Sequence, residues 1–444
     1  MDIKLSDHFT RGRLLRFTLP SIAMLLFASV YGMVDGYFVS NFVGKQAFSA
    51  VNLVTPLTMF VSTIGFMFGA GGTAIVSRTL GEKDPEKANN YFSLFVYVTL
   101  VIGAVFALLG ITFIRPIVAA LGAEGRLLED SVLYARIVMA AMPFFALQML
   151  FNSFFPAAER PQLGFRVTVA CGLTNIIGDA LLVLLLPQPY KLAGAAVATM
   201  LSQMVGGIVP IVYFAQPNGS LLRLGRTELS WRIILEGCVN GSSEFVNNAA
   251  MSIVSTLFNM QLLKFAGENG VAAYGVMMYI GLLFAAAFIG YTIGTAPIIG
   301  YNYGAKNHAE LHSVLAKSLQ MLGICGICMT ISAEALAIPL GRIFVGYDAE
   351  LMALTVSGFR IFALSFLFCG FAMFISGFFT ALSDGLTSAL ISFLRTLVFE
   401  AGAVMILPSF FGVNGIWVSV AAADVMALIL SGSFLLAKRK RFGY

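Results

Sequence analysis

Charged residues are scarce in this chain. Only 11% of its 444 residues are Asp, Glu, Lys or Arg, and 59% are hydrophobic, whereas a soluble domain carries about 25% charged residues. The mean hydropathy of +0.88 agrees. This composition excludes a soluble globular enzyme and indicates helices that lie in lipid. The net charge of +5 does not indicate nucleic-acid binding, because the basic residues lie in short loops between apolar runs.

Histidine and cysteine are also rare. The three histidines, His8, His308 and His312, lie outside the apolar runs, so no imidazole can serve as a metal ligand or base at membrane depth. The five cysteines lie within apolar runs, and Cys325-x-x-Cys328 has no second Cys pair or His nearby. No G-x-x-x-x-G-K-[ST] motif for ATP occurs. We therefore expect no enzyme, no resident metal and no cofactor, with an ion gradient as the energy supply.

Long apolar segments dominate what is present. Twelve of them reach the roughly 20 residues that a spanning helix needs, which predicts an all-α polytopic membrane protein. The run after Arg16 is too long for a signal peptide and lacks a cleavage site, so we expect it to be the first span. The widest polar gap, 215–233, predicts a cytoplasmic linker between an N-terminal lobe (1–214) and a C-terminal lobe (234–444). The predicted spans are 15–40, 47–78, 90–113, 131–156, 166–187, 192–214, 234–263, 271–302, 314–340, 353–382, 387–408 and 414–437.

The two halves repeat one plan. Residues 44–88 align without a gap to 267–311, with six identities. Because each half holds an even number of spans, both enter the membrane from the same side, and a pseudo-two-fold axis along the membrane normal relates them. Duplication of this kind is typical of secondary transporters. The identities pair Gly44, Ala50, Gly71, Ile75, Gly81 and Lys83 with Gly267, Ala273, Gly294, Ile298, Gly304 and Lys306.

Lysine and arginine are unevenly divided between the two sides. Eighteen of the 27 lie on the side that holds both termini, six on the other, and Arg136, Arg360 and Arg395 lie inside predicted spans. Cytoplasmic loops carry such an excess, so both termini are predicted to be cytoplasmic. Arg395 and Glu400 are five residues apart, a spacing that does not place them on one face of an α-helix. The sequence assigns no partner to Arg395, Glu400, Glu334 or Asp424.

Polar residues inside the first lobe form one candidate site. A charged residue at a helix centre costs roughly 2.5–3.5 kcal/mol on insertion scales, so it tends to be functional or paired. Asp35 lies in span 1, Asn175 and Asp179 lie on one face of span 5, and Thr199 lies early in span 6. Two neighbouring carboxylates can load one proton as a unit, or with the amide and hydroxyl they can hold Na⁺. The alternative is a neutral hydrogen-bonded cluster that pins these spans together.

A polar stripe on span 7 forms a second candidate surface. Its residues are spaced three and four apart, and a lipid-facing Glu244 is implausible, so we expect the stripe to face the central cavity. The alternative is a purely structural contact between helices. The predicted substrate-cavity residues are Tyr31, Gln203, Asn240, Glu244, Asn247 and Asn248.

Five motifs occur in order along the chain. They are the spacing from Pro20 to Asp35, the Val34-Asp35 dipeptide, Arg78-Thr79-Leu80-Gly81-Glu82-Lys83 after span 2, Asn175-x-x-x-Asp179, and Gly194-Ala195-Ala196-Val197-Ala198-Thr199. With the six-plus-six plan, the chain resembles over nearly its whole length the multidrug and toxic compound extrusion (MATE) transporters, and within them the bacterial MepA-like branch.

The resemblance implies a monomeric, ion-coupled exporter in the bacterial inner membrane. Its partners would be small amphiphilic, often cationic compounds and membrane lipid, with no nucleic acid. Pro20 matches the proline around which span 1 bends. A flippase for a lipid-linked precursor is the alternative, and it would favour a basic cavity, whereas most buried charges here are acidic. The residues that match the cation-coupling site for H⁺ or Na⁺ are Asp35, Asn152, Asn175, Asp179 and Thr199.

Overall fold

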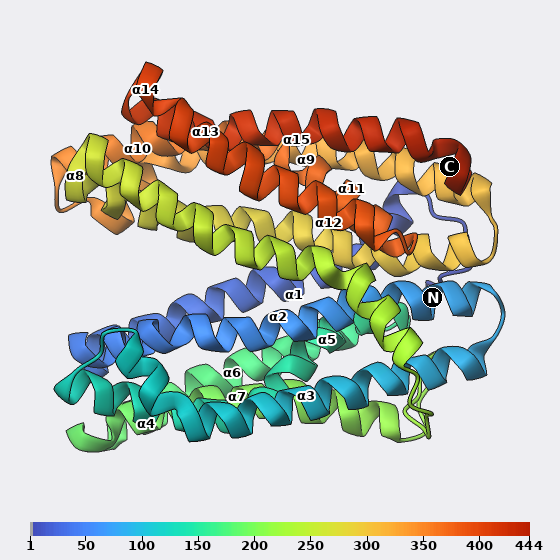
Figure 1. Ribbon diagram of the computed structural model, residues 1–444, viewed down its shortest axis with the longest axis horizontal. Helices are drawn as coiled ribbons and strands as arrows, with labels where there is room; N and C mark the ends of the chain where they lie inside the picture. The colour runs from blue at the N-terminus through green and yellow to red at the C-terminus, as the bar shows by residue number, and fades with distance from the viewer. Residues whose placement is uncertain (1–2) are drawn as a thin grey trace.

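The computed structural model describes residues 3–444, and over these residues it contains helices and connecting turns but no strand. Figure 1 shows two helical bundles stacked across a central seam, with both chain termini at one end, called here the terminus end. The residues 216–230 between the bundles are not helical. The N-terminal bundle holds α1 (Arg11–Phe38), α2 (Lys45–Gly81), α3 (Pro85–Ala120), α4 (Gly125–Ala140), α5 (Met142–Ala157), α6 (Pro161–Leu185) and α7 (Lys191–Ala215).

The C-terminal bundle is built from longer and more interrupted elements. A π-helical segment, η4 (Leu394–Glu400), interrupts its penultimate span, and a 3₁₀ turn over Leu364–Leu367 interrupts the span before it. Its α-helices are α8 (Trp231–Gly304), α9 (His308–Val345), α10 (Ala349–Ala363), α11 (Cys369–Ala381), α12 (Gly385–Phe393), α13 (Ala401–Ile406), α14 (Pro408–Phe411) and α15 (Val413–Phe442).

The twelve predicted spans are confirmed. Ten helical stretches of the described chain are long and apolar enough to cross a membrane, and α4 with α5, bent by 56°, forms an eleventh. The 74-residue α8 is two spans joined at Gly267, whose φ of 63° and ψ of −155° break the helix. Glycine adopts this backbone conformation without steric penalty. The break falls between the predicted spans 234–263 and 271–302.

Aromatic packing forms a core inside each bundle. In the N-terminal bundle the ring centroids of Phe92 and Phe154 are 5.0 Å apart, and Phe151 stacks on Phe214. In the C-terminal bundle Phe258 of α8 stacks on a tyrosine of the same helix across the Gly267 break. Lipid chains are as apolar as these side chains, so close packing rather than the hydrophobic effect drives such contacts in a membrane.

One tight turn recurs four times at the terminus end. Lys83, Glu159, Lys306 and Ser383 all have positive φ, between 55° and 65°. In each turn the residue after them donates its N–H to a carbonyl five positions back, as Asp84 does to Thr79 at 3.3 Å. This pattern caps the preceding helix and reverses the chain. The identity of Lys83 and Lys306 in the two repeats therefore reflects the same type of turn in each half.

Glycines bring the two bundles into backbone contact near the terminus end. A Cβ on Gly81 would overlap the carbonyl oxygen of Tyr301, and a Cβ on Gly304 would overlap that of Arg78. Gly71 meets α8 in the same way at Gly237. Small residues allow helices to approach this closely. Since Gly81 and Gly304 are equivalent in the repeat, the contact is symmetric and closes the terminus end.

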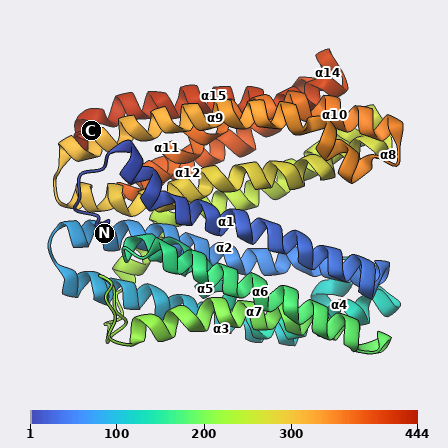
Figure 2. The same cartoon turned by 180° about the vertical axis from the view of Figure 1, so that it is seen from behind.

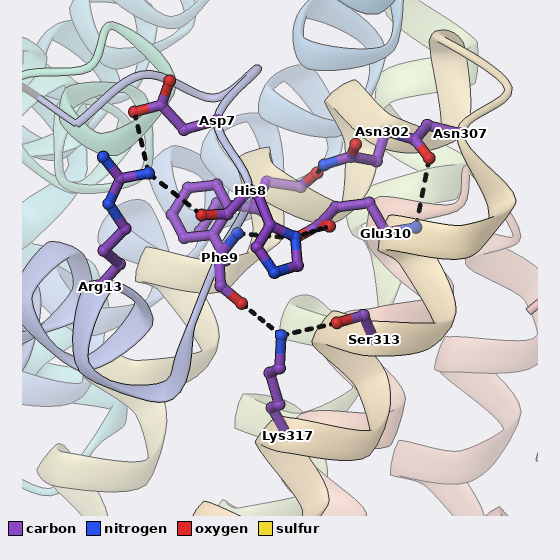
Figure 3. Close-up of polar contacts among 10 residues, drawn as sticks. Asp7, His8, Phe9, Arg13, Asn302, Asn307, Glu310, Ser313 and Lys317 are labelled. Atoms are coloured by element: carbon purple, nitrogen blue, oxygen red, sulfur yellow. Dashed lines mark hydrogen bonds and ion pairs between the residues drawn. The ribbon is translucent and has the colours of Figure 1, made fainter.

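The segment before α1 crosses this closed end. Leu5 and Phe9 are fully buried, and the Leu5 amide donates to Glu159 Oε1 at 2.6 Å. The Phe9 amide donates to Glu310 Oε1 at 2.8 Å, and His8 Nδ1 lies 2.6 Å from Glu310 Oε2 (Figure 3). Residues 3–10 thus form a strap from the α5–α6 turn of one bundle to α9 of the other.

Candidate functional site

Two carboxylates lie together inside the N-terminal bundle. Asp35 comes from α1, and Asp179 and Asn175 come from one face of α6. Asn175 Nδ2 donates to Asp35 Oδ1 at 3.3 Å, and Asp35 lies within hydrogen-bonding reach of Asp179 and Thr199. Asp179 is fully buried, and neither of its carboxylate oxygens receives a donor from the described residues. Asp35 is half-buried, and two carboxylates this close favour a proton or another cation between them.

A tyrosine that the sequence reasoning missed completes this cluster. Tyr134 of α4 is 6% exposed, and its hydroxyl lies within hydrogen-bonding reach of Thr199 on α7. Gly178 packs against Ala198, which lets α6 and α7 approach closely. An uncharged tyrosine in a span gives a weak sequence signal, because aromatic residues are common in spans. We call Asp35, Tyr134, Asn175, Asp179 and Thr199 the carboxylate cluster.

Two of the predicted cavity residues lie one helical turn nearer the terminus end. Tyr31 precedes Asp35 by one turn of α1 and lies within hydrogen-bonding reach of Gln148 of α5. Gln203 of α7 is 8% exposed, and its Oε1 receives no donor from the described part of the chain. Gln148, which sequence reasoning did not select, is also buried. A polar amide layer therefore lies directly beneath the carboxylate cluster.

Asn152 and Pro20 lie apart from the carboxylate cluster. Asn152 is one turn past Gln148 on α5, which runs toward the terminus end, and each turn adds about 5.4 Å. Within residues 3–444 no hydrogen bond joins Asn152 to Asp35 or Asp179. Pro20 lies inside α1, which continues through it without a break.

The polar residues of the predicted stripe on span 7 lie in different environments. Asn240 is 2% exposed, and its Nδ2 donates to the Thr380 carbonyl of α11 at 3.0 Å, so it joins two helices. Asn247 Oδ1 accepts from Thr396 Oγ1 at 3.2 Å inside the C-terminal bundle. Asn248 is exposed and donates to the backbone carbonyl of Glu244, whose side chain is half-buried. Asn240 and Asn247 therefore bond to neighbouring helices, and among these four residues only Asn248 is exposed.

Comparison with known proteins gives one family and several relatives. The MatE family model matches residues 20–181 and 245–404, in both halves of the chain. The multidrug export protein MepA of Staphylococcus haemolyticus is 24% identical over 429 residues, with 96% of this chain and 94% of that protein covered. MepA of Staphylococcus aureus strain MSSA476 is 23% identical, with 94% and 91% covered.

Solved structures share the whole architecture. A MATE protein crystallised in complex with MaL6 superimposes with a TM-score of 0.90 at 20% identity, covering 98% of this chain and 97% of that one. A MOP superfamily transporter from Pyrococcus furiosus, described as having a binding pocket of reverse polarity, gives 0.89 at 21%, with 98% and 96% covered. These likenesses establish the fold with its twelve spans in two lobes.

Proposed function

The chain belongs to the multidrug and toxic compound extrusion (MATE) family, and on that premise we propose that it exports amphiphilic, often cationic compounds in exchange for H⁺ or Na⁺ by alternating access. The carboxylate cluster is the observation that carries the proposal. Asp179 is fully buried without a donor and adjoins Asp35. A cation taken up there would relieve the repulsion between the two carboxylates, and its release would restore it, so occupancy is linked to the packing of α1 against α6.

The distribution of charges supports one orientation of the molecule in the membrane. The terminus end carries eighteen of the 27 lysines and arginines, which supports a cytoplasmic location for that end in a bacterial inner membrane. The glycine contacts of Gly81 and Gly304 close this end. The conformation described here therefore corresponds, in the proposal, to the outward-facing state, in which the carboxylate cluster takes up its cation from outside.

The energy of one coupled charge is sufficient for useful export. A single charge that crosses 100 mV supplies about 2.3 kcal/mol. Because about 1.4 kcal/mol corresponds to a factor of ten, this energy supports a gradient of roughly fortyfold for an uncharged substrate. One-for-one exchange for a monovalent cation moves no net charge, so the pH or sodium gradient itself must supply the energy there, and no nucleotide is needed.

The decisive experiment is efflux of a fluorescent cation from proteoliposomes with a pH gradient or a sodium gradient imposed separately. Wild-type protein is expected to transport under at least one gradient, and Asp35→Asn is expected to abolish gradient-driven transport while the protein still inserts. Asp130→Asn is the matched control, because Asp130 lies outside the cluster and pairs with Arg126 at 3.9 Å. Gradient-driven efflux by Asp35→Asn at the wild-type rate would contradict the coupling role.

A further inference from the structure

The C-terminal bundle contains a partly open cavity of about 150 Å³ that is lined by three charged side chains. Arg395 and Glu400 reach it from η4, and Asp424 reaches it from α15. Asn247 of α8 also lines it. The cavity is separate from the carboxylate cluster, because all of its lining residues belong to the C-terminal bundle.

The π-helical geometry of η4 brings two of these charges to one wall. Residues five apart point in different directions on an α-helix, which is why the sequence spacing argued against a common face for Arg395 and Glu400. A π-helix bonds i to i+5 and so brings residues five apart nearer to one face than an α-helix does. Such segments are rare and occur frequently at functional sites. Both residues therefore line the cavity, although Arg395 forms its ion pair with Asp424 and not with Glu400, as the five-residue spacing predicted.

The three charges do not cancel. Arg395 Nε lies 2.8 Å from Asp424 Oδ1, with side-chain exposures of 16% and 4%, so these two form a buried ion pair. No hydrogen bond or ion pair in residues 3–444 reaches the carboxylate of Glu400. The second oxygen of Asp424, Oδ2, is buried and also receives no donor. With Glu400 ionised, the cavity therefore holds one uncompensated negative charge and a second free acceptor.

The rest of the wall suits an organic cation. Tyr274, Phe362 and Phe366 present aromatic rings, and Met251 and Met278 present flexible thioethers. Aromatic faces attract cations through their quadrupoles, and methionine adapts to ligands of different shape. An apolar wall around one net negative charge selects a monovalent, hydrophobic cation over a hydrated metal ion, whose shell this wall could not replace.

We propose that this cavity is a second substrate-binding site, in which Glu400 binds the cationic group of an exported compound and the Arg395–Asp424 pair holds the net charge at minus one. The proposal rests on the proposed export function. It adds a binding location within the C-terminal bundle, and it names the substrate class as monovalent organic cations. Coupling would then belong to the carboxylate cluster and substrate charge recognition to Glu400.

Equilibrium binding to the purified full-length protein, with no gradient present, tests this proposal independently of transport. The probes are ethidium, a monovalent cation, and N-phenyl-1-naphthylamine, which is uncharged. Glu400→Gln is expected to weaken ethidium binding at least tenfold and to leave binding of the uncharged probe within about twofold. Glu334→Gln is the matched control, because Glu334 pairs with Arg360 outside this cavity and should leave ethidium binding unchanged.

A double variant tests whether ethidium binding depends on the charge of Glu400 or on the Arg395–Asp424 ion pair. Arg395→Gln with Asp424→Asn removes the pair but keeps Glu400, so ethidium binding is expected to persist and to be weakened at least tenfold when Glu400→Gln is added. Gel filtration and thermal unfolding of each variant check that it is folded. Unchanged ethidium affinity in Glu400→Gln, or loss of ethidium binding in Asp35→Asn alone, would place the cation in the other bundle and overturn the proposal. Ethidium binding through Glu400 without gradient-driven efflux would instead overturn only the transport function.

Discussion

At the scale of single residues, the notable feature is a buried carboxylate that lacks a donor. Asp179 has no exposed surface, and neither of its oxygens receives a donor from the described residues. An unsatisfied buried polar group costs about 1–3 kcal/mol, and more when it is charged. Such a group persists where it serves function, because the same property that destabilises the empty site gives it an affinity for a cation.

We therefore expect Asp179→Asn to stabilise the protein and to abolish ion-coupled export. Asparagine has nearly the same shape and can donate a hydrogen bond to Asp35, which removes the repulsion between the two carboxylates. The free energy of unfolding should rise by roughly 1–3 kcal/mol, measured as a higher Tm in detergent. Asn175→Ala, which removes the hydrogen bond to Asp35, should lower Tm. A lower Tm for Asp179→Asn would show that the carboxylate is satisfied in a way this structure does not contain.

At the scale of helices, glycine decides how the two bundles meet. The contacts of Gly81 with Tyr301 and of Gly304 with Arg78 join backbone to backbone, so no side chain can rotate away to make room. Each contact can form only when the terminus end is closed. Gly81 and Gly304, which are equivalent in the repeat, thus both favour the conformation in which the terminus end is closed.

Gly81→Ala and Gly304→Ala are each expected to disfavour closure of the terminus end. Overpacking costs about 1–3 kcal/mol, so the ratio of closed to open molecules should fall by roughly tenfold for each 1.4 kcal/mol. Spin-label distances across this end, between α2 and α8, would lengthen, and export would slow. Gly275→Ala is the control, because a Cβ there meets nothing within 4 Å. Equal distance distributions in Gly81→Ala, Gly275→Ala and wild type would contradict this role.

At the scale of the whole molecule, the strap of residues 3–10 joins the bundles at their closed end. Its amides donate to Glu159 of one bundle and to Glu310 of the other. Figure 2, seen from behind, shows the chain before α1 crossing this end beside the C-terminus. If the bundles separate there during transport, the strap must leave one of its two carboxylates.

Glu310→Ala should release the strap from the C-terminal bundle. Glu310 is 7% exposed and accepts from the Phe9 amide and from His8. Hydrogen bonds to a charged group contribute about 1.5–3 kcal/mol, so amide hydrogen exchange in residues 5–9 should accelerate by roughly ten- to a hundredfold. Glu86→Ala, an exposed acid on the same end, should leave this exchange unchanged. Protection equal to wild type in Glu310→Ala would mean that burial of Phe9 alone fixes the strap.

Glu159, the carboxylate that holds the strap to the N-terminal bundle, makes the stability of the folded protein depend on pH. Burial raises the pKa of Glu159 above its ordinary value, against the opposing hydrogen bond from the Leu5 amide. The folded state therefore holds this proton more tightly than the unfolded state does. The stability that the protonated carboxyl contributes is complete below the ordinary pKa and is lost as pH rises through the raised pKa.

Glu159→Gln is expected to remove this loss, because glutamine does not titrate. The Tm of wild type relative to Glu159→Gln should fall as pH rises across that window, in thermal unfolding scans at a series of pH values. The difference between Glu86→Gln and wild type should stay flat. A constant difference between Glu159→Gln and wild type at all pH values would refute the raised pKa.

Much of the architecture was predictable because it depends on local pattern. Span length, the i, i+4 spacing of Asn175 and Asp179, and the matched glycines at 81 and 304 are properties of short segments, and lipid requires such segments to be helices. The predicted spans, the duplication and the family follow from them. The same rule of buried polar residues could also have selected Gln148.

Only the tertiary structure decided which residues meet. Tyr134 joins the carboxylate cluster through the packing of α4 against α7, and Arg395 and Glu400 share a wall because η4 departs from α-helical geometry. The strap contacts join residues about 150 and 300 positions apart. Such pairings depend on long-range packing and on small changes in helix pitch, and neither has a signal in a local sequence period.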